Sequence, residues 1–260
     1  MRCLKCMYVE SRKSMGSERL FPDFYLLDIW AIHVIPRYQY QPRSVPRDYN
    51  EFVFILVIVI AYLLGSVPSA DIASRLIKRK GIHESSDDNM GTLTVLREIG
   101  LLPGLLVFFA DVAKGTLSVL VAERLGSSQA IVFIAGFAAV IGHNWPIFLN
   151  FRGGRGGATT FGVLLGFAPM AGTIAFIIML LVIIPTSNAR LALLAGFIAI
   201  PLFIWVLKGD SGIILYSIAL PLTLGIHVLI LDRKSLSQAE VKKNLIVDHD
   251  YTFWQKRRKQ

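Results

Sequence analysis

A histidine, two arginines and a glycine-rich turn occupy the segment 142–162, GHNWPIFLNFRGGRGGATTFG, which lies between long apolar stretches. Its closely spaced glycines are Gly153, Gly154, Gly156 and Gly157. Glycine lets the backbone approach a bound group closely, and N–H groups at the start of a following helix can point at an anion. Arg152 and Arg155 would supply countercharge for a phosphate or a carboxylate. Because charge is costly at membrane depth, this segment predicts a functional site.

His143 precedes this turn, and its residue type allows two interpretations. It would orient a bound phosphate or relay a proton from a hydroxyl group, since an imidazole titrates near neutral pH. Alternatively, it is a histidine at a helix end that bonds to a backbone carbonyl. The sequence leaves both interpretations open.

An acid and a base stand together inside the apolar run that begins at Asp111 with DVAKGTLSVLVA. Asp111 and Lys114 are one helical turn apart and share a helix face. In a membrane such a pair is either a buried ion pair between helices or part of a ligand site. The neighbouring Gly115 would allow close helix packing, so the structural interpretation has equal weight on physical grounds.

Hydroxyl groups flank a proline in GSVPSA, residues 65–70. Ser66 and Ser69 are candidate hydrogen-bond donors to a ligand. They would equally well bond back to carbonyls of their own helix beside a proline kink. Of the two, Ser66 is our candidate for a contact with the ligand.

The elements that position these groups are predicted to be membrane helices. Hydrophobic residues make up 54% of the chain and charged residues 17%, and the mean hydropathy is +0.56, which excludes a soluble domain. The net charge of +9 fits basic segments lying against anionic headgroups, with nucleic acid the weaker explanation. Cys3 and Cys6 form a lone CxxC, which we interpret as incidental thiols rather than a metal site or disulfide framework.

Apolar runs that can cross about 30 Å of hydrocarbon predict an all-α integral membrane protein, a helical bundle of about seven transmembrane helices within a range of five to seven. The runs lie near 52–74, 99–121, 129–149, 157–171, 172–187, 190–207 and 212–231. The run 157–171 is short and glycine-rich. It would also fit a helix that enters the membrane partway and is separated from its neighbour at Pro169.

Basic residues in the short loops set the predicted orientation. The loops after the first and third spans and the C-terminal tail should be cytosolic, and the polar site with them. We divide the chain into an N-terminal extension of unknown role (1–50), a transmembrane domain (51–232) and a basic cytosolic tail (233–260). The basic residues of the extension conflict with an external N-terminus, and the sequence does not resolve this conflict.

The segment 142–162 resembles the third signature block of the acyl-phosphate-dependent glycerol-3-phosphate acyltransferases, membrane enzymes of bacterial phospholipid synthesis. The block reads roughly GHxxPxxxxFxGGKGxAT. The matching residues are Gly142, His143, Pro146, Phe151, Gly153, Gly154, Gly156, Ala158 and Thr159. Arg155 stands where the family usually carries lysine, which keeps the charge and changes its geometry.

Two further blocks are similar to this family. DVAKG matches its DVxKG signature, whose lysine is thought to engage substrate phosphate, and GSVPSA is similar to its GSIP segment. The resemblance implies a phosphate contact for Lys114 and a substrate contact for Ser66.

Two blocks depart from the family pattern. The segment 81–97 keeps Asn89 and Arg97 of the GSGNxGATNxxR signature, and the C-terminal block keeps His227 while Ile230 replaces an asparagine. The first of these blocks also contains three carboxylates, Glu84, Asp87 and Asp88. Negative charges there would repel a dianion at short range.

The resemblance implies acyl transfer from a fatty acyl phosphate to the primary hydroxyl of glycerol 3-phosphate, giving lysophosphatidic acid and phosphate. It implies no metal or organic cofactor, because the donor is already activated. The implied partners are both substrates and membrane lipids, without nucleic acid, and the implied place is the bacterial inner membrane with the site facing the cytosol. The implied catalytic residues are Lys114 and His143, and the implied substrate contacts are Ser66, Asn89, Arg97, Gly153, Gly154, Arg155, Gly156 and His227.

The departures leave two other functions open. One is a noncatalytic family member that kept the fold and binds a lipid or a partner. The other is a related acyltransferase with a different acceptor, because an acidic loop suits a neutral or cationic hydroxyl compound better than glycerol 3-phosphate.

Overall fold

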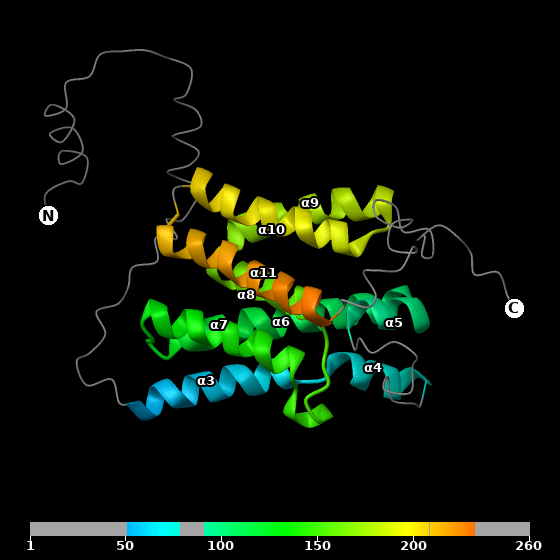
Figure 1. Ribbon diagram of the computed structural model, residues 1–260, viewed down its shortest axis with the longest axis horizontal. Helices are drawn as coiled ribbons and strands as arrows, with labels where there is room; N and C mark the ends of the chain where they lie inside the picture. Colours follow the sequence, from blue (N-terminus) through cyan, green and yellow to red (C-terminus); the bar gives the residue numbers. More distant parts are fainter. Residues whose placement is uncertain (1–50, 79–90, 208, 232–260) are drawn as a thin grey trace, which may run out of the picture. The chain divides into compact units, whose positions relative to one another are not determined.

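The structure is a computed structural model that describes residues 51–78, 91–207 and 209–231, all of them within the unit 41–260. The predictions for the N-terminal extension, for Asn89 with its acidic neighbours, and for the basic tail fall outside the described residues. Every regular element in the described ranges is a helix, as the sequence predicts (Figure 1).

The helices in chain order are α3 (Glu51–Ser66), α4 (Ser69–Lys78), α5 (Thr92–Glu98), α6 (Leu101–Arg124), α7 (Gln129–Asn144), the 3-10 turn η2 (Ile147–Leu149), α8 (Gly157–Phe167), α9 (Pro169–Thr186), α10 (Ala189–Val206) and α11 (Ser211–Leu231).

Six helical stretches in the described part of the chain are long and apolar enough to cross a membrane. They are α3 with α4, α6, α7 with η2, α9, α10 and α11. The helix α8 has 11 residues and a length of ~16 Å, about half of a hydrocarbon core. The prediction of a multi-pass helical membrane protein is therefore confirmed. The predicted run 157–171 is a short helix that ends before Pro169.

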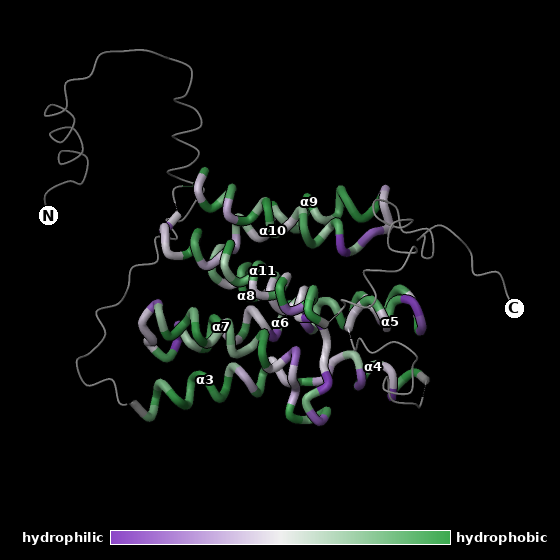
Figure 2. The backbone as a smooth tube through the Cα atoms, in the orientation of Figure 1, coloured by the Kyte–Doolittle hydropathy of each residue, from purple (hydrophilic) through white to green (hydrophobic). Residues whose placement is uncertain are grey.

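The surface composition agrees with a lipid environment. Figure 2 shows apolar residues along the helices, and polar residues gathered around α4, α5 and the segment between α7 and α8. Large apolar side chains point outward from the long helices, for example Leu181 with 67% and Leu215 with 68% of their surface exposed. A soluble protein rarely exposes a contiguous surface of this kind, whereas lipid tails solvate it.

The short helix α8 is surrounded by other helices. Gly156, at its start, lies against the Asn144 side chain at the end of α7. Phe167, at its end, packs edge-on against Phe133 near the start of α7, with ring centroids 5.1 Å apart. Hence α8 runs back along α7, and most of its side chains are buried, as expected for a helix that is apolar on all faces.

The contact between α6 and α8 depends on residues without side chains. A Cβ on Gly115 would overlap the Thr159 carbonyl, and one on Gly162 would overlap the Val112 carbonyl. The predicted role of Gly115 in close helix packing is thus confirmed, and it brings the start of α8 beside the middle of α6.

A break separates α3 from α4 at Val67 and Pro68, which are not helical. Pro68 has no N–H with which to continue the helical hydrogen bonds. Just before the break, α3 packs closely on α7, because a Cβ on Gly65 would overlap the Ala139 carbonyl. The break therefore lies beside the end of α7.

The turn between α7 and α8 is held against α4, α5 and α6. Leu149 packs on a buried cluster formed by Ala70, Val95 and Val107. This small core fixes the loop next to the α3–α4 break, where the polar residues converge.

Candidate functional site

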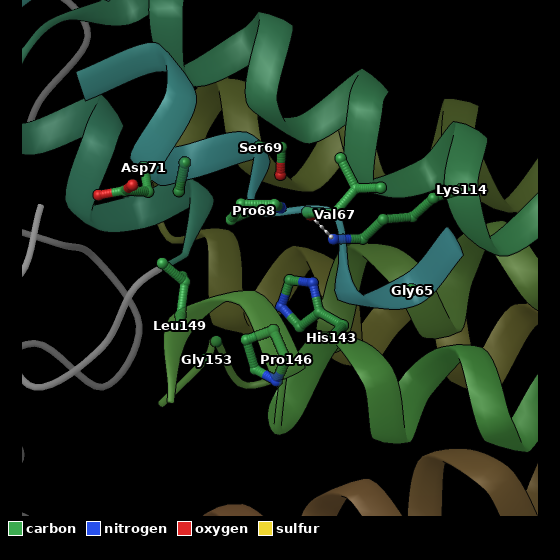
Figure 3. Close-up of a pocket in the computed structure, with 12 residues that line it drawn as sticks. Gly65, Val67, Pro68, Ser69, Asp71, Lys114, His143, Pro146, Leu149 and Gly153 are labelled. Atoms are coloured by element: carbon green, nitrogen blue, oxygen red, sulfur yellow. Dashed lines mark hydrogen bonds between the residues drawn. The ribbon is translucent and has the colours of Figure 1, made fainter. Parts of the chain in front are cut away.

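A pocket lies where the α3–α4 break, α6, the end of α7 and the glycine-rich turn meet (Figure 3). Its lining residues are Gly65, Val67, Pro68, Ser69, Ala70, Asp71, Lys114, His143, Pro146, Leu149, Gly153 and Gly154. Four of them, Lys114, His143, Gly153 and Gly154, are site residues predicted from the sequence. The fold brings together segments that are far apart along the chain.

Lys114 reaches from α6 toward the α3–α4 break, as Figure 3 shows. Its Nζ lies 2.9 Å from Oδ1 of Asp111 and donates a hydrogen bond to the Val67 carbonyl at 3.2 Å. Only 7% of Lys114 and 1% of Asp111 is exposed, so the predicted buried ion pair is present. An ammonium has three N–H donors, and the described residues use two of them. The third has no partner among the described residues.

His143 points into the same region from the end of α7 (Figure 3). Its Nδ1 lies 3.7 Å from Oδ1 of Asp111, which is beyond hydrogen-bond distance, and has no hydrogen-bond partner among the described residues. In the described residues, the Nδ1 of His143 therefore does not bond to a backbone carbonyl, which was the alternative interpretation. The ring is buried and lines the pocket.

The glycine turn is built by close backbone contacts. The Gly154 N–H donates to the His143 carbonyl at 3.2 Å, and a Cβ on Gly153 would overlap that same carbonyl. Gly156 has φ 75°, in the left-handed region that favours glycine, and precedes α8. Because the Gly154 N–H is used within the protein, the turn offers fewer donors to an anion than its sequence indicates.

The two serines of GSVPSA differ in position. Ser66 is fully buried, its Oγ has no hydrogen-bond partner in the described ranges, and it does not line the pocket. Ser69, on the far side of Pro68, lines the pocket and donates to Oδ1 of Asp111 at 2.5 Å. Neither serine hydroxyl is seen bonding back to its own helix, so that interpretation does not apply here.

Other predicted contacts lie away from the pocket lining. Arg97 is exposed on α5, and Arg155 is half-buried with partners of its own. His227 on α11 packs edge-on against Trp145, with ring centroids 4.5 Å apart. Neither these residues nor Gly156 line the pocket, and Asn89 is outside the described residues.

The sequence offers Asp111 and Ser69 as candidates, but neither is in the predicted set of catalytic residues and substrate contacts. The sequence carried a signal for each, because Asp111 begins the DVAKG block and Ser69 ends the hydroxyl pair of GSVPSA. Asp71, the carboxylate among the lining residues, points away from Lys114 in Figure 3 and pairs with Arg75 at 2.6 Å.

Comparisons with known proteins point to one family. The family model described as glycerol-3-phosphate acyltransferase matches residues 55–238. Glycerol-3-phosphate acyltransferase 1 of Dehalococcoides mccartyi is 40% identical over 198 residues, which cover 74% of this chain and 95% of that protein. Glycerol-3-phosphate acyltransferase 2 of Moorella thermoacetica is 44% identical over 132 residues, covering 51% of this chain and 68% of that protein.

The fold is similar to crystal structures of PlsY (YgiH), an integral membrane glycerol 3-phosphate acyltransferase. Its lysophosphatidic acid form matches with a TM-score of 0.60 and 28% identity, over 71% of this chain and 92% of that one. Its glycerol 3-phosphate form matches with a TM-score of 0.58 and 27% identity, over 72% of this chain and 100% of that one. The similarity therefore extends over the bundle rather than over one motif.

Proposed function

This chain belongs to the glycerol-3-phosphate acyltransferase family, and from that premise we propose that it transfers a fatty acyl group from acyl phosphate to glycerol 3-phosphate. The products are lysophosphatidic acid and inorganic phosphate. The observation that carries the proposal is the pocket in which the buried Lys114 and His143 stand beside the glycine turn. The glycerol 3-phosphate form of PlsY supports the choice of acceptor.

Both substrates carry phosphate, and the pocket presents a buried cation. Lys114 has one N–H left after its contacts with Asp111 and Val67, and this donor meets the phosphate of the acyl donor. In a site with little water, such a charge stabilises an anion more strongly than it would in bulk solvent. Gly153 keeps the turn close to the same region because it has no side chain.

His143 carries the proton of the acceptor in this proposal. The hydroxyl oxygen of glycerol 3-phosphate attacks the acyl carbonyl carbon, and the bond from that carbon to the phosphate oxygen breaks. The hydroxyl proton passes to the His143 ring and from there to the departing phosphate, so that the histidine returns to its starting state. No acyl-enzyme is needed, because acyl phosphate is itself an activated donor.

The proposed setting is the inner membrane of a bacterium, with the pocket at the cytosolic side. Exposed arginines surround the pocket end of the bundle, namely Arg75, Arg97 and Arg152. Basic residues at one end of a membrane bundle favour a cytosolic placement. Ile147 and Phe148, exposed next to the lining residues Pro146 and Leu149, favour entry of the acyl chain from the bilayer.

The test is phosphate release by purified, detergent-solubilised protein supplied with palmitoyl phosphate, with and without glycerol 3-phosphate. Acceptor-dependent release, with lysophosphatidic acid detected by mass spectrometry, supports the proposal when Lys114→Ala abolishes both. Gly225→Ala is the folded control, because a methyl group there meets open space in the described structure. No release from folded protein would overturn the assignment. Release that needs a different hydroxyl compound would identify another acceptor.

A further inference from the structure

We infer that Asp111 is a positioning residue of this pocket, which orients the Lys114 ammonium and, once substrate is bound, the His143 ring for the transferring group. The inference rests on the proposed acyl transfer and adds a residue to its machinery. Asp111 does not itself line the pocket, so it acts through the groups that do.

Four helices meet at the Asp111 carboxylate. Its Oδ1 accepts a hydrogen bond from Ser69 Oγ on α4 at 2.5 Å and lies 2.9 Å from Lys114 Nζ on α6. Its Oδ2 accepts a weak contact from Thr92 Oγ1 on α5 at 3.5 Å. His143 Nδ1 on α7 lies 3.7 Å from Oδ1. One side chain thus faces polar groups from all four of these helices.

Charge neutralisation alone would not require this arrangement. A buried ammonium needs one counterion, yet Ser69 and Thr92 also direct their hydroxyls at the same carboxylate. Asp111 is 1% exposed, so no solvent competes for its oxygens. The hydrogen bond from Ser69 and the weaker contact from Thr92 restrict the rotation of the carboxylate, and the Lys114 ammonium is oriented in turn.

The relation to His143 concerns which ring nitrogen carries the proton. Nδ1 has no hydrogen-bond partner among the described residues, and Asp111 is the carboxylate that faces it. A shift of less than one ångström would let Nδ1–H donate to Oδ1. That bond places the proton on Nδ1 and leaves Nε2 unprotonated, ready to accept the proton of the acceptor hydroxyl.

Steady-state kinetics on the full chain in detergent test this role. Asp111→Asn removes the charge at constant size, and Asp111→Glu keeps the charge and displaces it by one methylene. We expect each to lower kcat about 10- to 100-fold with a smaller change in KM. A carboxylate that no longer orients Lys114 and His143 slows the chemical step more than it weakens substrate binding. Thr92→Val removes a contact to Asp111 from outside the pocket and should lower kcat about threefold.

The matched control is Thr116→Val, on the same helix as Asp111. Thr116 donates to the Gly162 carbonyl and not to Asp111, so kcat should be unchanged. Folded Asp111→Asn and Asp111→Glu enzymes with kcat within about twofold of the parent would overturn the inference. If the Asp111→Asn variant does not fold, the kcat values of Asp111→Glu, which keeps the charge, and of Thr92→Val test the inference instead. An inactive parent overturns the proposed function and this inference with it, whereas an active parent with tolerant variants overturns only the inference.

Discussion

The Asp111 carboxylate lies 2.9 Å from the Lys114 ammonium, one turn away on α6, and both side chains are buried within a membrane-length helix. Each charge offsets part of the desolvation cost of the other. Because little water screens them, a change in either partner acts strongly on the one that remains.

Lys114→Met should destabilise the protein and abolish activity. The substitution keeps the length of the side chain but leaves Asp111 buried without its counterion, which costs about 3–5 kcal/mol in a typical interior. Unfolding in detergent, followed by tryptophan fluorescence, measures the loss. The double variant Lys114→Met with Asp111→Asn should regain most of the stability while remaining inactive. A single variant as stable as the parent would contradict the buried pair.

His143→Gln should lower kcat by about 10²- to 10⁴-fold, the usual contribution of a general acid–base group. Its stability should change by less than about 1 kcal/mol, since Nδ1 makes no hydrogen bond in the described structure. Burst and steady-state phosphate release, together with unfolding curves, separate the two effects. Retained kcat would assign the proton transfer to a substrate phosphate instead of the histidine.

Gly153→Ala should disrupt the turn and with it the pocket. The added methyl group would overlap the His143 carbonyl and come 2.5 Å from Pro146 Cδ, so the backbone must move. We expect a loss of about 1–3 kcal/mol, in the range of overpacking, and a fall in kcat/KM. Gly225→Ala, within α11, is the comparison and should be neutral or slightly stabilising. Equal behaviour of the two variants would show that the turn tolerates a side chain.

Cysteine labelling checks the proposed orientation. In a Cys3→Ser and Cys6→Ser background, Arg152→Cys lies at the pocket end of the bundle, and Arg124→Cys lies at the opposite end of α6. A membrane-impermeant maleimide added to intact cells should label position 124 and leave position 152 unlabelled until the cells are lysed. The reverse pattern would place the pocket outside the cytosol.

Local patterns predicted much of the fold. Asp111 and Lys114 are one turn apart, so helical geometry alone places them on one face. His143 and the glycine turn are close in the sequence, and the backbone bond from Gly154 to the His143 carbonyl needs no distant segment. Membrane spans follow from composition over windows of ~20 residues, and Pro169 marked the separation of α8 from α9.

The convergence on Asp111 was not predictable from such patterns. It depends on which helices pack together, and this is decided by close contacts such as Gly65 with Ala139, far apart in the sequence. Ser66 and Ser69 are chemically the same, yet the break at Pro68 turns only Ser69 toward Asp111. The sequence pattern offers no means of telling them apart, because the direction of the chain after a proline depends on its neighbours.

The shortness of α8 has a consequence for how this protein is made. At 11 residues it is too brief to be recognised and retained by the insertion machinery as an independent span. It must enter the bilayer with α9, to which only Ala168 connects it, after α6 and α7 are already in place to receive it. The close packing of α8 on α6 is therefore completed late in synthesis, after all the residues that line the pocket, which end at Gly154, have been made.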